Sequence, residues 1–172
     1  IRSGNGVPRA AASRLLGRVR SDRVFHFPAP PQTGAVGRPA KHGPEFALAD
    51  TSTSPQPDVT TTSDTSRYGT AKAYAWHRLH PRLTSRAAWR QHNGELPIIE
   101  GTLIRLQVEH LPGDRDPKPV WLWTSTVDAA PADVDRLIFG AYLRGLRAEG
   151  WTSVRLLDRA AAGRLARVDI PH

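Results

Sequence analysis

The clearest alternation of hydrophobic and polar positions lies between residues 94 and 127. From Ile104 to Glu109, apolar and polar residues alternate with period two, which predicts a strand with one buried face and one solvated face. The run VWLWTSTV at 120–127 begins with continuous apolar residues, as a central strand does. Because a turn-rich loop at 112–119 joins the two runs, we predict a β-hairpin over Gly94–Val127.

Shorter apolar runs predict further elements on both sides of this hairpin. Residues 14–27 contain two such runs, so we expect a pair of strands with a turn near Ser21 and Asp22. Pro131 and the acidic residues that follow it suit the first turn of a helix, which we place over Pro131–Arg144. A second helix is possible over 155–168.

The remaining segments carry weaker patterns. Residues 1–13 are small and polar and are expected to be a loose end. Seven of the 15 Pro residues lie between Pro28 and Pro57, and the polar tract TTTSDTS follows, so residues 28–66 are predicted to be an irregular insertion. Residues 67–94 mix aromatic residues with Arg and His, and Pro81 would interrupt a helix there, so we predict short helical turns.

Composition narrows the classes of partner. The formal net charge is +8, which favours a polyanion such as nucleic acid or an acidic membrane surface. Arg far outnumbers Lys, however, as coding in a GC-rich genome would also produce. The chain contains no Cys, no apolar run of bilayer length and no basic-then-apolar leader, so we expect a cytoplasmic protein without a membrane partner. It also contains no Met, so we expect a segment, a processed product or a damaged reading frame.

Several long runs resemble insertion-sequence transposases of actinobacteria, of the type whose active site is two Asp and one Glu. The resemblance covers about residues 14–144, and its runs are RSDRVF (20–25), GRPAKHGPEFALAD (37–50), TTTSDTSRYGTA (60–71), WHRLHPRLTSRAAW (76–89) and the stretch from Gly94 to Ser125. It implies an α+β or α/β fold over residues 14–172. That fold would be a partial ribonuclease-H-like mixed sheet with the irregular insertion and C-terminal helices.

The same resemblance implies two-metal cleavage and transfer of DNA strands, with Mg²⁺ held by the three carboxylates. This chain departs from that pattern. In the family, both Asp come before the region that matches RSDRVF at 20–25, but no acidic residue occurs in residues 1–19. The segment that should carry the Glu matches the family at Ala141–Arg144, but the sequence after Arg144 does not, as if an internal deletion had removed the Glu. Glu149 lies near this point, but its neighbours do not match the family pattern. We therefore assign no catalytic residue and no metal ligand, and we expect no cofactor in this chain although Mg²⁺ belongs to the intact family.

If the chain retains a function, we expect it to be binding to the DNA backbone. The candidate phosphate contacts are two groups of arginines, each of which could equally be a solvated face: Arg18, Arg20 and Arg23, then Arg82, Arg86 and Arg90. Trp121 and Trp123 point to one face of their strand, where core packing is favoured over base stacking. His77 and His80 are three apart, and a structural role outweighs a metal pair. Three hypotheses follow: an inactive transposase fragment, a non-enzymatic module that binds the DNA backbone and, least favoured, an intact but unusual nuclease that uses other carboxylates.

Overall fold

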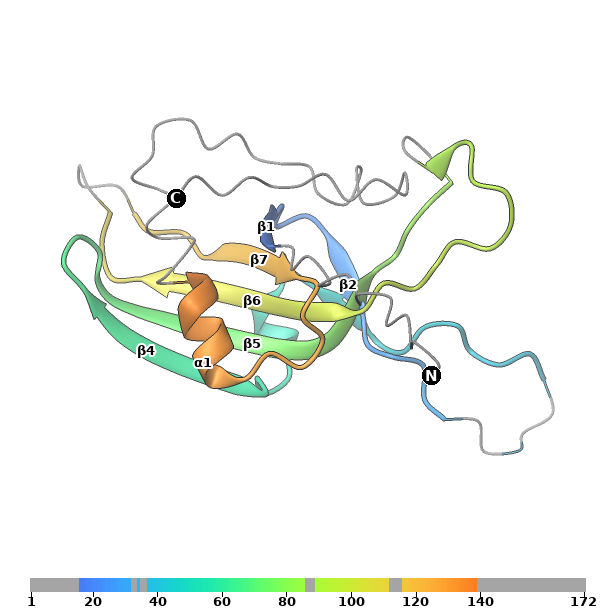
Figure 1. The fold of residues 1–172 in the computed structure, drawn as a ribbon, viewed down its shortest axis with the longest axis horizontal. Coiled ribbons are helices and arrows are strands. Elements are labelled where there is room, and N and C mark those ends of the chain that lie inside the picture. The colour runs from blue at the N-terminus through green and yellow to red at the C-terminus, as the bar shows by residue number, and fades with distance from the viewer. Residues whose placement is uncertain (1–15, 32–33, 35–36, 86–88, 112–115, 139–172) are drawn as a thin grey trace, which may run out of the picture.

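A computed structural model describes residues 16–31, 34, 37–85, 89–111 and 116–138. These residues form a curled, half-barrel sheet of seven antiparallel strands (Figure 1). The elements are β1 (Leu16–Val19), β2 (Val24–His26), β3 (Glu45–Ala47), the 3-10 turn η1 (Thr51–Thr53), β4 (Val59–Thr65), β5 (Gly69–Pro81), β6 (Gly101–Val108), β7 (Val120–Thr124) and the helix α1 (Pro131–Asp135).

The sheet is organised around β5, its longest strand. The order runs β1-β7-β6-β5, and the far edge of β5 is shared by two partners. β4 pairs with its first part, from Gly69 to Ala75, and β2 pairs with its last two residues. β3 continues the sheet beyond β2. Two strands that precede β5 in the chain, β2 and β4, therefore pair with opposite ends of β5 along the same edge.

The predicted hairpin over Gly94–Val127 is confirmed. β6 and β7 pair antiparallel, with Arg105 opposite Trp121 and Leu103 opposite Trp123. β7 lies between β1 and β6, as its continuous apolar run predicted. The polar positions of the predicted alternation are the more open ones, because Arg105 and Gln107 are half-buried and Glu109 is exposed, whereas Ile104 and Leu106 are buried. Leu103, which precedes the alternation, is fully buried in the aromatic-rich cluster.

The predicted fold class was wrong. Every strand pair among the described residues is antiparallel, and the one regular helix there has five residues, so this is not a ribonuclease-H-like mixed sheet with C-terminal helices. The main error was β5, where short helical turns were expected. Its inward positions Ala71, Ala73 and Ala75 alternate with larger residues, and Pro81 ends the strand, where Pro is tolerated.

The segments on either side of this strand also differed from expectation. The turn at Ser21 and Asp22 is present, but β1 pairs with β7 while β2 pairs with β3 and β5, so the two strands do not pair with each other. Within the region 28–66, β3 and β4 are regular. The tract Val59–Thr65 forms a strand because β-branched Thr packs well on a pleated surface. Gly69, with φ of 65°, makes the tight turn into β5.

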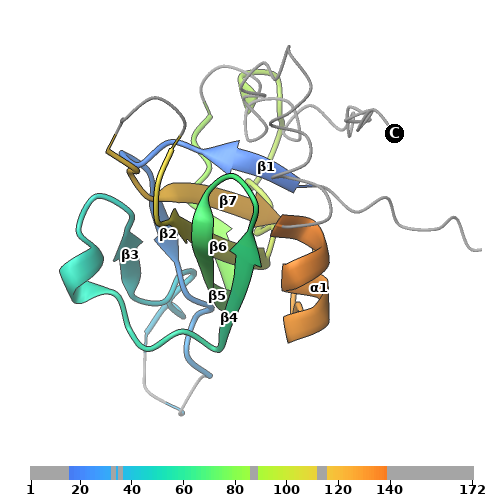
Figure 2. The same ribbon diagram turned by 90° about the vertical axis from the view of Figure 1, so that its left-hand side faces the viewer.

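Two hydrophobic clusters lie on opposite faces of the sheet. Figure 2 shows α1 on one side of the sheet and β2 and β3 on the other. The cluster under α1 is aliphatic and includes Ala73, Ile104 and Leu122. The other cluster is rich in aromatic rings, among them Phe46, Trp76, Trp121 and Trp123. The two tryptophans of β7 are thus core residues, as the sequence favoured.

The helix α1 begins at Pro131, as predicted, with Asp133 in its first turn. Val134 and Ile138 bury their side chains against the aliphatic cluster. The rest of the helix predicted up to Arg144 and the second helix over 155–168 lie largely or wholly outside the described residues. No helix in the described part of the chain is long and apolar enough to cross a membrane.

Candidate nucleic-acid interface and a buried histidine cluster

In the first group of predicted arginines, Arg18 lies on β1, and Arg20 and Arg23 lie on the connection between β1 and β2. Arg18, Arg20 and Arg23 are all exposed, while Val19 and Phe25 on the two strands are buried and anchor the turn. The Arg23 amide donates to the Arg20 carbonyl over 3.2 Å, which closes the turn. Arg20 pairs with Asp22 at 2.5 Å, so its charge is partly neutralised. Arg18 and Arg23 form no ion pair with an acid of the described residues.

The second group is only partly described. Arg82 and Arg90 are exposed, and Arg86 lies outside the described residues. The pairing of β2 with β5 sets Phe25 opposite Pro81. Arg82 therefore leaves β5 at the end of the sheet where Arg23 leads into β2. The fold brings these two arginines to one region although 58 positions separate them in the chain.

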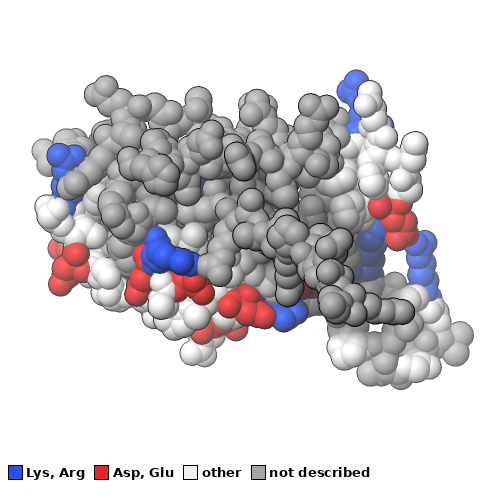
Figure 3. All heavy atoms as spheres, in the orientation of Figure 1, with Lys and Arg blue, Asp and Glu red and all other residues white. Residues whose placement is uncertain are grey.

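Charge is unevenly divided along the sequence. Basic and acidic residues almost balance within the described part, whereas the remaining segments carry most of the net charge of +8. On the face in Figure 3, basic and acidic side chains are interspersed over the described residues. That face therefore offers no broad basic surface among the described residues, and the arginines near the β1–β2 turn remain the better candidates for phosphate contact.

Sequence reasoning missed an arginine that is stacked on aromatic rings. The Arg105 guanidinium carbon lies 4.7 Å from the ring centroid of Tyr74, 5.8 Å from that of Trp76 and 5.9 Å from that of Trp121. Tyr74 and Trp121 are its direct neighbours across β5 and β7. Aromatic residues at alternate positions of the neighbouring strands were the available signal, because such residues share a face.

A second missed feature is a cluster of three histidines. His26 on β2 lies opposite His80 on β5, and the loop before β3 adds His42. Ring centroids are 5.0 Å apart for His26 and His42, 5.2 Å for His42 and His80, and 6.0 Å for His26 and His80. His42 Nδ1 and His80 Nε2 are 2.9 Å apart, at hydrogen-bonding distance. His26 and His80 are buried, and His42 is half-buried.

The surroundings of His80 and His42 lower the pKa of both imidazoles. Burial, and then the neighbouring His42 and His26, lower the pKa of His80 to about 4. The pKa of His42 is also lowered, first by burial and then by His26, Lys41 and Arg82. Both imidazoles are therefore neutral at pH 7.

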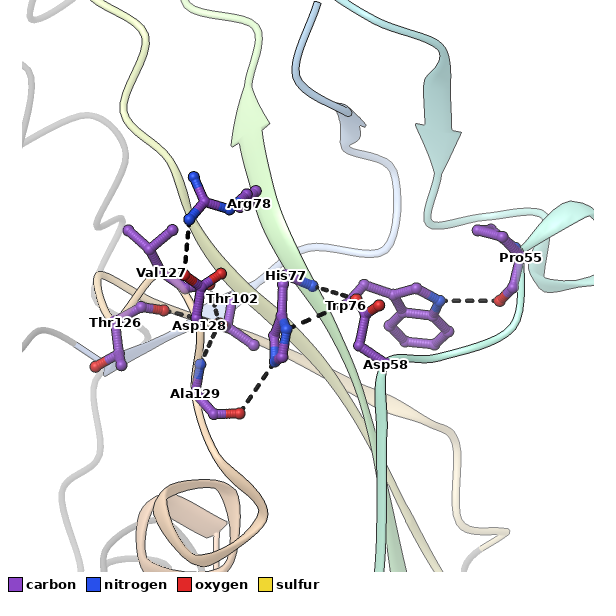
Figure 4. A network of polar contacts seen from close by, with 10 residues as sticks. All are labelled: Pro55, Asp58, Trp76, His77, Arg78, Thr102, Thr126, Val127, Asp128 and Ala129. Carbon is purple, nitrogen blue, oxygen red and sulfur yellow. Dashed lines mark hydrogen bonds and ion pairs between the residues drawn. The ribbon is translucent and has the colours of Figure 1, made fainter. Parts of the chain in front are cut away.

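A bulge in β5 separates His80 from His77, which the sequence had considered as a pair. Arg78 adopts φ of 58°, and the register with β6 shifts between Trp76 and Leu79. His77 turns instead toward the other face, where its Nε2 contacts the Ala129 carbonyl at 3.0 Å and its amide donates to Asp58 (Figure 4). The two histidines thus have different neighbours and cannot act together.

The same bulge is tied to the segment that leads into α1. Arg78 pairs with Asp128 at 2.7 Å, and its backbone amide donates to the Val127 carbonyl (Figure 4). The buried Thr102 hydroxyl lies 2.7 Å from the Thr126 carbonyl and 2.8 Å from that of Val127, and it accepts from the Ala129 amide. These contacts fix the turn before α1 and have a structural role.

No three His, Cys, Asp or Glu side chains of the described residues are grouped as a metal site. Glu149, which the sequence places near the point where the family's Glu is absent, lies outside the described residues. Comparisons with protein-family models, with curated proteins and with solved structures each gave no match.

Proposed function

We propose that this chain derives from a transposase of the Asp-Asp-Glu type and contacts the DNA backbone without cleaving it. Support for the family comes from the sequence runs that resemble such transposases, and these runs supply residues of β2 to β7. Since the described sheet is antiparallel throughout and differs from the catalytic fold that the resemblance implied, the proposal concerns DNA contact and not strand transfer.

The observation that carries the proposal is the exposed basic segment that runs from Arg18 on β1 to Arg23 just before β2. Arg18 and Arg23 face solvent without an acidic partner among the described residues, and Arg82 leaves the sheet at the same end. Guanidinium groups bind phosphate oxygens well because their planar donors match the geometry of the anion. Such contacts fix a protein on DNA without reading the bases, so binding should be independent of sequence.

A salt titration of DNA affinity tests this proposal. Fluorescence anisotropy with two duplexes of unrelated sequence should give similar affinities that fall as salt rises. Replacing Arg18, Arg20 and Arg23 by Ala should flatten the plot of log affinity against log salt by about 2 to 3 units, because each lost phosphate contact removes roughly 0.9. Arg20 is expected to contribute least, since Asp22 already pairs with it.

A matched control carries the same loss of charge elsewhere. Arg67, Lys72 and Arg136 are exposed, and Arg136 pairs with Asp133 as Arg20 pairs with Asp22. The variant with these three residues changed to Ala should keep the original slope. An equal loss in both variants would show a general charge effect, and an unchanged slope in the first variant would remove the contact from this turn. Mg²⁺-dependent nicking of supercoiled DNA that disappears in a Glu149→Ala variant would contradict the non-cleaving assignment.

A further inference from the structure

The histidine cluster contains two buried nitrogens without a hydrogen-bond partner, His26 Nε2 and His80 Nδ1. A neutral imidazole has one N–H and one lone pair, so the partner of one nitrogen decides the state of the other. His26 Nδ1 lies 3.4 Å from the Gly43 carbonyl oxygen, which can only accept. The proton of His26 therefore belongs on Nδ1, and the buried Nε2 carries a bare lone pair.

The same reasoning orders the contact between His42 and His80. If His80 Nε2 donates to His42 Nδ1, the buried His80 Nδ1 is left as a lone pair. The opposite arrangement would bury an N–H of His80 without an acceptor, which costs more free energy. The favoured neutral cluster therefore has two bare lone pairs pointing away from any described donor.

The groups that surround the buried His80 nitrogen disfavour its protonation. A proton on either lone pair would create a buried N–H without a described acceptor, beside two other imidazoles. Lys41 and Arg82 add positive charge near His42. Two carboxylates lie in the region: Glu45, which is exposed opposite His26 in the β2–β3 register, and Glu95, which pairs with Lys41 at 3.6 Å.

The cluster joins the segment 37–44 to the sheet. The Gly43 amide donates to the Phe27 carbonyl over 2.9 Å, and the Phe27 amide donates to the Pro44 carbonyl over 3.0 Å. A Cβ at Gly43 would lie 2.2 Å from the Pro28 carbonyl oxygen, so the two backbones approach as closely as only Gly allows. His42, next to Gly43, is the side chain that connects this segment to His80 on β5.

We propose that His26, His42 and His80 form a proton-sensitive latch that holds segment 37–44 against the β2–β5 junction while His42 and His80 are neutral and releases it in acid. The sign follows from the lowered pKa of His80, because a base whose folded pKa lies below its unfolded value destabilises the closed state when it is protonated. The stabilisation is complete above the usual His value near 6.5. It is lost progressively as the pH falls toward about 4.

Amide hydrogen exchange of the full chain between pH 7.5 and pH 4 tests the latch, after correction for the intrinsic rate at each pH. Protection of the Gly43 and Phe27 amides should fall by about a hundredfold, as a shift from 6.5 to about 4 implies. The Leu103 and Ile104 amides in the centre of the sheet should keep their protection over the same range. An equal loss at all four amides would mean global acid unfolding and would overturn the proposal.

Substitutions assign the effect to the cluster. In His80→Gln, the amide keeps an N–H donor but cannot be protonated, so most of the pH dependence at Gly43 should disappear. His110→Gln changes an exposed ring outside the cluster and should leave the pH dependence intact. If His80→Gln does not fold, His42→Gln at the half-exposed position should reduce the effect. Unchanged pH dependence in a folded cluster variant would refute the latch.

Discussion

The two faces of the sheet differ in what they bury. The face under α1 is packed by aliphatic side chains, and the small residues Ala71, Ala73 and Ala75 of β5 lie fully buried in its core. The opposite face is packed by large rings, and Arg105 and the histidines lie at the margins of this aromatic packing. The aromatic face thus holds a half-buried guanidinium and two buried imidazoles, whereas small and branched aliphatic side chains pack together under α1.

This difference places the chemistry of the described residues on the aromatic face. Its cluster provides flat surfaces for a guanidinium, and the neighbouring junction of β2, β5 and the loop before β3 buries imidazoles. On the aliphatic side, the polar contacts of Thr102 and Arg78 serve to fix one turn. We therefore expect changes on the aromatic face to affect stability and pH response together, and changes on the aliphatic face to affect stability alone.

The largest effect is expected for Trp76→Ala. Trp76 is 2% exposed, packs against Phe46 and Trp121, and donates from its indole nitrogen to the Pro55 carbonyl over 2.9 Å. Its loss leaves a cavity and an unpaired carbonyl, so the free energy of unfolding should fall by about 3 to 5 kcal/mol. Urea denaturation measures this. Ile104→Val on the aliphatic face should cost only about 0.5 to 1.5 kcal/mol, and equal losses would refute a dominant aromatic cluster.

The strands that could be predicted are those whose pattern is strong and local. The alternation from Ile104 to Glu109 and the apolar start of β7 indicated the hairpin because one face of each strand meets a continuous core. β5 was missed because the buried positions of its first half are Ala71, Ala73 and Ala75, which carry little hydrophobic signal, and because the bulge at Arg78 breaks the period. The pairing of β2 with β5 depends on contacts far apart in sequence, which no local pattern encodes.

A smaller effect, on the aliphatic side, is expected for Thr102→Val. The substitution keeps the shape of the side chain but removes a buried hydroxyl that contacts the Thr126 and Val127 carbonyls and the Ala129 amide. The Thr126 carbonyl and the Ala129 amide would lose this partner, while the Val127 carbonyl still accepts from the Arg78 amide, so the free energy of unfolding should fall by about 1 to 3 kcal/mol. Thr124→Val is the matched control. Thr124 is opposite Thr102 and equally buried, but its hydroxyl makes only one long contact of 3.4 Å, to the Thr126 amide, so its loss should matter less.

The candidate site was only partly accessible from the sequence. Charge and exposure follow from residue type, so Arg18, Arg20 and Arg23 could be named, and the structure leaves all three exposed. Their proximity to Arg82 could not be named, since it arises from the long-range pairing of Phe25 with Pro81. The histidine cluster has the same origin, because His26, His42 and His80 come from three separate segments. The sequence offered only the spacing of His77 and His80, which did not favour a metal pair, and the bulge turns His77 toward the Ala129 carbonyl.

The smallest expected effect concerns the cation stacked on the aromatic face. Arg105→Lys keeps the charge and most of the stem but loses the flat guanidinium that lies 4.7 Å from the Tyr74 centroid. The free energy of unfolding should fall by about 0.5 to 1 kcal/mol, as for other partly exposed cation–π contacts. Arg105→Met separates charge from packing, because it retains an apolar stem and removes the cation. Urea denaturation should rank the proteins Arg above Lys above Met if the rings stabilise the charge. A Met variant as stable as the Arg protein would show that the rings only cover the stem, and the two faces would then differ in shape alone.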